Sequence, residues 1–200
     1  MKIGVLALQG DFREHIATLT SLGIDSYAVK TVEELTSVDA LVIPGGESTT
    51  ISKLAIAFGI MEPIRLRIAQ GMPVYGSCAG MILLSKKIID AASEQESFGG
   101  IDITVRRNAF GRQVDSFESK LVVKGIPGEP VQAIFIRAPW VESAGVDVEV
   151  LASVEIDGQS HPVAVRQNNA LATSFHPEIS GDSRIHRYFV EEICQPAVGK

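Results

Sequence analysis

Residues 73–86 read PVYGSCAGMILLSK. The short apolar segment Pro73–Tyr75 predicts a buried strand, and Met81–Lys86 predicts a helix. Between them lies a glycine-bracketed turn, Gly76–Gly80, with a cysteine at its centre. A strand followed directly by a helix is the repeating unit of parallel sheets. The stretch therefore predicts an α/β fold and places a cysteine at the carboxyl end of a strand.

The same alternation of strand and helix signals fills the N-terminal half of the chain. Short apolar runs predict strands, and apolar residues at helical spacing predict helices. The expected elements are strands at Lys2–Leu8, Ile24–Val29 and Asp39–Ile43, helices at Phe12–Leu22 and Glu62–Gln70, and a helix capped by Ser48 or Thr49 that runs to about Phe58. Together they predict a doubly wound, mostly parallel sheet with flanking helices.

The C-terminal half has a different pattern, in which short strands are separated by turns such as Gly125–Gly128 and Asp157-Gly158. Strands are expected at Ile101–Arg107, Lys120–Val123, Ala133–Ile136, Val148–Ile156, Pro162–Gln167 and Ala170–Phe175, with a closing helix at Ser183–Ile193. This pattern predicts additional antiparallel strands on the same core. Residues 90–100 are the most loop-like segment, for which we expect mobility. We expect one domain over residues 1–200.

Composition narrows the classes of protein. The 200 residues are 46% hydrophobic and 21% charged, with a net charge of −6. This acidic balance argues against nucleic-acid and anionic membrane partners, which require a basic face. No signal-peptide pattern precedes the first apolar run, and no run reaches the ~18 residues of a membrane span. With only two cysteines, a reducing, cytoplasmic setting is the simplest interpretation.

Cys78 has the sequence context of a nucleophile. The G-x-C-x-G pattern between a strand and a helix is that of a nucleophile elbow with cysteine in place of serine. The glycines allow a sharp turn, and the helix N-terminus favours a thiolate. The amide of Ala79 is placed to bind an oxyanion. The alternative, a structural cysteine beside a glycine-rich turn, does not require both glycines.

His176 and Glu178 supply the other two groups that such a nucleophile needs. They lie in Ser174-Phe175-His176-Pro177-Glu178, at the end of an expected strand. Residues i and i+2 of an extended segment project to the same side. His176 can therefore act as the base and Glu178 can orient it.

A second glycine-rich turn, Pro44-Gly45-Gly46-Glu47-Ser48, follows another expected strand. Its glycines allow a ligand to approach the backbone closely, and the amide of Gly46 is a candidate second oxyanion donor. If the peptide between Gly45 and Gly46 flips, the oxyanion hole is lost. The turn lacks the glycine patterns of nucleotide-binding loops, so we disfavour nucleotide binding.

These segments resemble a known family. The P-G-G-E-S, G-S-C-A-G and S-F-H-P-E segments, in this order, are similar to those of class I, triad-type glutamine amidotransferases. Four further segments resemble the glutaminase subunits of pyridoxal 5′-phosphate synthase: LQGDFREH at 8–15, PGGESTT at 44–50, RNAFGRQ at 107–113 and FIRAP at 135–139. The resemblance runs from Lys2 to about Glu192.

The resemblance implies a specific reaction. Cys78 would form a glutamyl thioester, His176 would protonate the departing ammonia and activate water, and Glu178 would hold the imidazole. The residues implied to contact L-glutamine are Gly46, Glu47, Ser48, Arg107, Ile136 and Arg137, and arginine suits bidentate capture of a carboxylate. Ammonia would pass to a barrel-type synthase subunit of a hetero-oligomer that makes pyridoxal 5′-phosphate. The resemblance implies no cofactor and no metal.

Two other classes of function remain open. One is a Cys–His–Glu hydrolase of another specificity, such as a peptidase, against which the 107–113 segment argues. The other is a non-catalytic binding or regulatory subunit, which would not require all three triad residues. His15, His161 and His186 lack metal-ligand spacing and are interpreted as surface or packing residues. The resemblance places Gln9–His15 near the partner.

Overall fold

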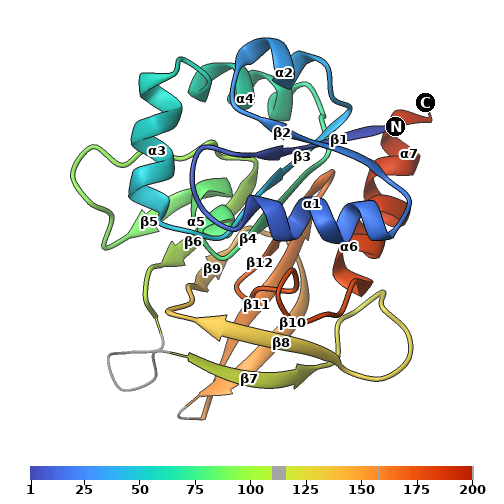
Figure 1. Ribbon diagram of the computed structural model, residues 1–200. Helices are drawn as coiled ribbons and strands as arrows, with labels where there is room; N and C mark the ends of the chain where they lie inside the picture. Colours follow the sequence, from blue (N-terminus) through green and yellow to red (C-terminus); the bar gives the residue numbers. More distant parts are fainter. Residues whose placement is uncertain (110–115, 157, 200) are drawn as a thin grey trace.

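A computed structural model describes residues 1–109, 116–156 and 158–199 of the chain. Its centre is a seven-stranded sheet with the strand order β10-β11-β12-β4-β3-β1-β2 (Figure 1). Five neighbouring strands are parallel: β1 (Lys2–Leu6), β2 (Asp25–Val29), β3 (Ala40–Ile43), β4 (Val74–Ser77) and β12 (Ala170–Thr173). The antiparallel strands β11 (Gln159–Gln167) and β10 (Glu149–Ile156) extend one edge.

Helices cover both faces of this sheet, as the sequence predicts. One face packs against α2 (Val32–Thr36), α3 (Ser48–Ala57), α4 (Met61–Ala69) and α5 (Ala79–Leu84). The other face packs against α1 (Phe12–Ser21), α6 (Arg184–Tyr188) and the π-helical segment Phe189–Cys194, which continues into α7 (Gln195–Val198). Because both faces are covered, the central strands are fully buried, and they therefore appear in the sequence as continuous apolar runs.

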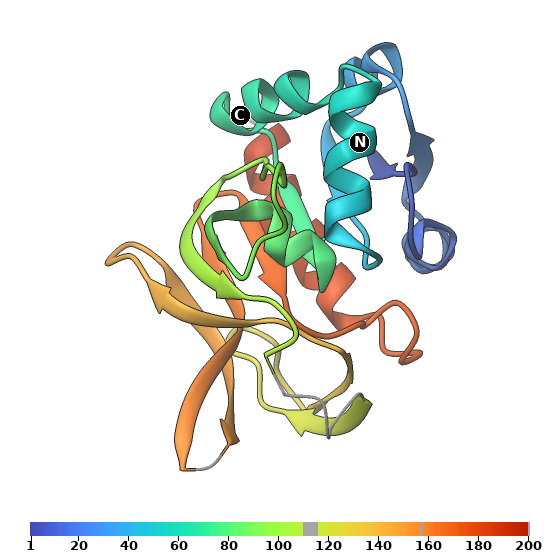
Figure 2. The same ribbon diagram turned by 90° about the vertical axis from the view of Figure 1, so that its left-hand side faces the viewer.

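The remaining strands form two small sheets beside the main one (Figure 2). One contains β5 (Ser85–Ile89), β6 (Ile101–Arg106) and β9 (Trp140–Ala144), and the other pairs β7 (Ser116–Leu121) with β8 (Val131–Ile136). The additional antiparallel strands predicted for the C-terminal half are confirmed: β10 and β11 extend the main sheet, and β6 with β9 and β7 with β8 pair antiparallel in the small sheets. The predicted turn at Asp157-Gly158 lies partly outside the described residues.

Several local predictions were wrong. The sequence predicted neither α2, β5 nor β9. The helix expected at Met81–Lys86 begins at Ala79 and ends at Leu84, because the chain enters β5 at once. The cap of α3 is Glu47 rather than Ser48 or Thr49: its carboxylate accepts hydrogen bonds from the amides of the next turn.

The loop at residues 90–100 is anchored at several points. The Arg65 guanidinium on α4 donates hydrogen bonds to the Ser97 carbonyl and to the Glu96 carboxylate. Phe98 is buried in the hydrophobic core. These contacts attach residues 96–98 to the core, and the mobility of the segment stays a prediction.

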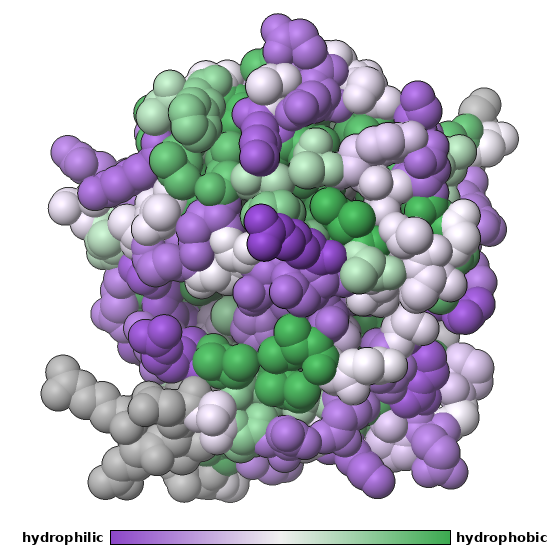
Figure 3. Space-filling view, viewed as in Figure 1, coloured by the Kyte–Doolittle hydropathy of each residue, from purple (hydrophilic) through white to green (hydrophobic). Residues whose placement is uncertain are grey.

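Figure 3 shows hydrophilic and apolar side chains intermixed on this face of the molecule. Among the described residues, no helix combines the length and the apolar character that a membrane span requires.

Candidate active site

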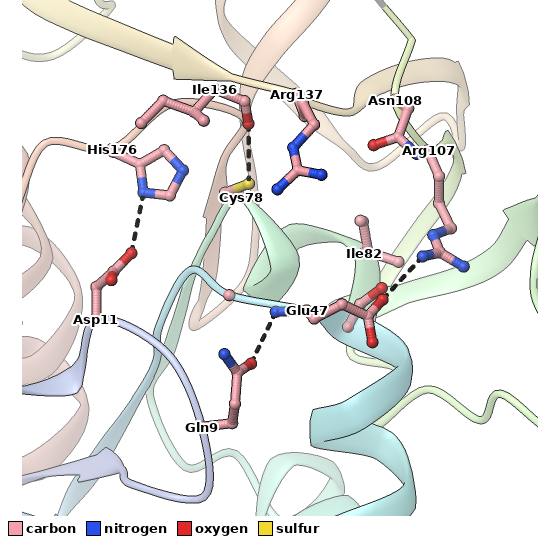
Figure 4. Close-up of a pocket in the computed structure, with 12 residues that line it drawn as sticks. Gln9, Asp11, Glu47, Cys78, Ile82, Arg107, Asn108, Ile136, Arg137 and His176 are labelled. Carbon is pink, nitrogen blue, oxygen red and sulfur yellow. Dashed lines mark hydrogen bonds and ion pairs between the residues drawn. The ribbon is translucent and has the colours of Figure 1, made fainter. Parts of the chain in front are cut away.

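A pocket of about 390 Å³ lies at the carboxyl edge of the parallel strands (Figure 4). Chain segments that follow β1, β3, β4 and β12 meet there, as expected for ligand sites of open α/β sheets. The residues that line it are Gln9, Asp11, Gly46, Glu47, Ser48, Cys78, Ile82, Arg107, Asn108, Ile136, Arg137 and His176.

The turn that carries Cys78 is strained and tightly packed. Cys78 has φ 47° and ψ −101°, a backbone conformation that residues other than glycine rarely adopt. A Cβ on Gly76 would lie 2.5 Å from the backbone of Gly80, and one on Gly80 would collide with the carbonyl of Ile43. The Cys78 amide donates a 2.8 Å hydrogen bond to the carbonyl of Thr173 on β12. These contacts hold the thiol at the pocket wall, although the residue is only 7% exposed.

His176 and Glu178 lie beside the thiol. Nδ1 of His176 is 2.7 Å from Oε1 of Glu178, and both side chains are buried. Burial alone lowers the pKa of His176, but hydrogen bonds to Cys78 and Glu178 outweigh this effect and raise the pKa to about 10. Burial raises the pKa of Glu178, against the opposing effect of its hydrogen bond to His176. The arrangement can hold a proton on the imidazole next to a sulfur nucleophile.

The glycine loop after β3 is held by the segment that follows β1. The amide of Glu47 donates a 2.7 Å hydrogen bond to Oε1 of Gln9, and the amide of Asp11 donates one of 3.2 Å to the carbonyl of Gly45. Gly46 has φ 146°, which favours glycine. The Gly45–Gly46 backbone is therefore fixed by two contacts that a local rearrangement would break.

Charged side chains on the opposite wall pair with one another. Arg107 lies 3.0 Å from Glu47 and donates a 2.9 Å hydrogen bond to Gln95. Arg106, the neighbouring residue, contacts Glu142 and Asp90 and does not line the pocket. Because Glu47 is about half exposed, its ion pair with Arg107 contributes little to stability and can be exchanged for a ligand.

The structure brings most of the sequence-predicted site residues together. The pocket is lined by Gly46, Glu47, Ser48, Cys78, Arg107, Ile136, Arg137 and His176. Glu178 lies behind His176, and Ala79 begins α5 directly after the nucleophile. Phe110–Gln113 of the 107–113 segment lie outside the described residues.

The sequence did not predict Gln9, Asp11, Ile82 and Asn108 as pocket residues. For Gln9 and Asp11 a signal existed: they follow β1, which is the neighbour of β3, and the carboxyl ends of parallel strands share an edge. Gln9 and Asp11 line the pocket and His15 is fully buried. The placement of Gln9–His15 near a partner stays a prediction.

Asp11, His176 and Glu178 offer possible metal-ligand atoms within 4.8 Å of one another. His176 and Glu178 already form a hydrogen bond with each other. This hydrogen bond and the 3.7 Å electrostatic contact between Asp11 and His176 account for the closeness of these side chains without an ion.

The fold and the site define a class of α/β protein with a cysteine at a strand-to-helix elbow and a histidine–carboxylate pair beside it. Within this class, the chain belongs to the SNO glutamine amidotransferase family, whose profile matches residues 5–195.

Two named relatives and one solved structure are similar to the chain over most of its length. The chain is 62% identical over 191 residues to "Pyridoxal 5'-phosphate synthase subunit PdxT" of Streptomyces coelicolor, covering 96% of this chain and 93% of that protein. It is 60% identical over 195 residues to the protein of the same name from Mycolicibacterium vanbaalenii, covering 96% and 97%. A solved structure described as a glutamine amidotransferase superposes with a TM-score of 0.86 at 49% identity, covering 94% of this chain and 97% of that chain.

Proposed function

We propose that the chain hydrolyses L-glutamine to L-glutamate and ammonia, and that the ammonia passes to a partner subunit that makes pyridoxal 5′-phosphate. The observation that carries this proposal is the contact between His176 and Glu178 beside the Cys78 elbow, at a pocket of a size that suits a small molecule. The names of the PdxT relatives support the choice of product and partner.

The reaction uses a nucleophile, two oxyanion donors and one acid–base group of this chain. The Cys78 sulfur attacks the carboxamide carbon, and the amides of Ala79 and Gly46 stabilise the resulting oxyanion. His176 donates its proton to the leaving nitrogen, so ammonia departs and a glutamyl thioester remains. His176 then takes a proton from water as the water attacks the thioester, which releases glutamate and restores the thiolate–imidazolium pair.

The other pocket residues suit the amino-acid end of glutamine. Arg107 and Arg137 carry positive charge for the α-carboxylate, and Glu47 carries negative charge for the α-ammonium group. Ser48 and the backbone of Gly46 and Ile136 complete the contacts that we propose. Glutamine would replace the present pairing of Arg107 with Glu47.

The same proposal covers the organisation of the protein. We propose that residues 1–200 form one glutaminase domain without a metal or other cofactor, bound to a barrel-type synthase subunit in a hetero-oligomer. A reducing compartment, the cytoplasm, would keep the required Cys78 thiol free, and both cysteines of the chain are unpaired.

Glutamine-dependent ammonia release tests the proposal. We expect release by the purified chain to be slow alone and to rise on the order of 10²–10³-fold with a pyridoxal 5′-phosphate synthase subunit, the range that one oxyanion donor supplies. The physical reason is that two hydrogen bonds hold the Gly45–Gly46 backbone, and a partner can rearrange them.

Cys78→Ala is the control for this experiment, and it should release no ammonia. Release that requires Cys78 but ignores the synthase would point to an amidase of another pathway. No release under any condition would point to a binding subunit.

The pH dependence should show the protonation of His176. The pKa of His176 is about 10, above the ordinary value of 6.5, so the imidazolium persists through neutral pH. The stability that its contacts contribute is fully present below about pH 6.5 and is lost as the pH rises through about 10. We expect glutamate formation to fall along an alkaline limb near pH 10, with circular dichroism as the check on folding. An alkaline limb near pH 6.5 would contradict this assignment.

A further inference from the structure

Two buried histidines lie behind the candidate triad, on its side away from the pocket. His15 comes from α1 and His186 from α6, and both are 0% exposed. Nδ1 of His15 is 2.8 Å from Nε2 of His186, and Nε2 of His15 is 3.0 Å from Oγ of Ser77, the residue before the candidate nucleophile. The two histidines thus form a buried hydrogen-bonded chain that ends at the elbow.

This chain also reaches the carboxylate of Glu178. One oxygen of Glu178, Oε1, contacts His176 at 2.7 Å. The other, Oε2, is buried and has no hydrogen-bond partner among the described residues. Nε2 of His15 lies 3.5 Å from this oxygen, which is an electrostatic contact and is long for a hydrogen bond. A buried carboxylate oxygen depends on such a contact, because desolvation penalises its charge.

Both histidines are neutral at neutral pH. Burial lowers the pKa of His15 well below its ordinary value, and the nearby His186 and His176 lower it further. Burial also lowers the pKa of His186 to about 4. The titratable groups that face the pair are His176, Glu178 and Tyr75, whose ring lies edge-on to both imidazoles.

A neutral His15 carries a single N–H, and its surroundings select the nitrogen. With the proton on Nε2, His15 donates to Ser77 and presents positive potential to Oε2 of Glu178. Its Nδ1 is then an acceptor, and Nε2 of His186 donates to it. With the proton on Nδ1, a lone pair of His15 would face the carboxylate at 3.5 Å, which is repulsive. The carboxylate therefore favours the first arrangement.

We propose that His15 and His186 are positioning residues of the glutaminase site. His186 fixes the tautomer of His15, and His15 directs its N–H at Ser77 and at the free oxygen of Glu178. This contact fixes the carboxylate that orients His176. The inference rests on the proposed function, but it concerns residues that do not line the pocket and do not touch glutamine.

Substitutions at His15 distinguish positioning from packing. In the complex with a synthase subunit, we expect His15→Leu to lower kcat on the order of 10–100-fold, with little change in KM. Removal of a residue that orients a metal-ligating histidine costs activity in the same range. His15→Gln keeps an N–H near the position of Nε2 and should retain most of kcat. A packing role predicts the opposite order, because leucine fills a buried site better than glutamine. His186→Leu and His186→Gln should follow the same order with smaller losses.

Alkylation of Cys78 by iodoacetamide provides a measure that does not need glutamine. The thiolate displaces iodide and forms a carbon–sulfur bond, so the rate depends on the His176 contact. We expect the order wild type, His15→Gln, His15→Leu from fastest to slowest, with Cys78→Ala as the blank. If the wild type releases no ammonia, the proposed function fails, whereas this order still tests the positioning role.

Nitrogen-15 NMR of the wild-type chain completes the test, because it reports which ring nitrogen of His15 carries the proton and does not depend on whether any variant folds. We expect His15 to carry its proton on Nε2. A proton on Nδ1, an imidazolium at neutral pH, or leucine variants that match or exceed the glutamine variants in both rate measurements would overturn the proposal.

Discussion

Glu178→Gln should lower kcat for glutamine hydrolysis on the order of 10⁴-fold while the fold persists. The carboxylate contacts Nδ1 of His176 at 2.7 Å and therefore keeps the proton on that nitrogen when the ring is neutral. An amide in its place can donate its own N–H to Nδ1, which would select the wrong tautomer. The substitution also removes the hydrogen bond to the Glu178 carboxylate, which is one of the contacts that raise the pKa of His176. The measurement is kcat and KM in the complex with the synthase.

The matched control for this variant is Glu191→Gln. Glu191 lies in the C-terminal π-helical segment, half exposed, and pairs with Arg187 at 3.5 Å. This substitution makes the same change of charge without altering the pocket, so kcat should stay near that of the wild type. A loss of less than tenfold for Glu178→Gln would show that Glu178 does not orient His176.

The parts of the site that the sequence predicted are those that local chain geometry determines. Gly76 and Gly80 bracket Cys78 because no Cβ fits at either position. His176 and Glu178 could be paired because residues two apart on an extended segment share a side. Such relations lie within five residues of sequence, so one sequence suffices to predict them.

The contacts that the sequence did not predict join distant segments. His15 and His186 are 171 residues apart, and Arg107 and Glu47 are 60 apart. Nothing local distinguishes a histidine that orients a carboxylate from one that packs in a core. His15 and His186 were interpreted as surface or packing residues, and only the three-dimensional arrangement places them beside Ser77 and Glu178.

The fold shows the same difference between elements that local sequence determines and elements that distant contacts determine. The buried strands β3 and β12 were predictable, because helices on both faces require continuous apolar runs. The helix α2 and the strands β5 and β9 were not, because most of their residues are not buried, so no continuous apolar run indicates them, and because they depend on their neighbours in space. Local propensity is a weak signal for short elements.

Gly45→Ala should lower kcat on the order of 10³-fold, through a clash and not through backbone strain. A Cβ at this position would collide with Cε1 of His176 and lie 2.8 Å from its Nδ1. The ring cannot yield without breaking its 2.7 Å contact with Glu178, and the loop cannot yield without moving the candidate oxyanion donor at Gly46. Either response misplaces a reacting group. Glutamine turnover in the complex is the measurement.

Gly128→Ala separates this effect from a general cost of replacing a glycine. Gly128 has φ 93° and no neighbour within 4 Å of an added Cβ, so alanine there is strained but meets no other residue. It should cost about 1–2 kcal/mol of unfolding free energy and leave turnover unchanged. Gly45→Ala should show a large loss of turnover in addition to a cost of about 1–3 kcal/mol of unfolding free energy from overpacking. If Gly45→Ala retains wild-type turnover, His176 can shift without penalty, and the alignment of the three groups does not limit the rate.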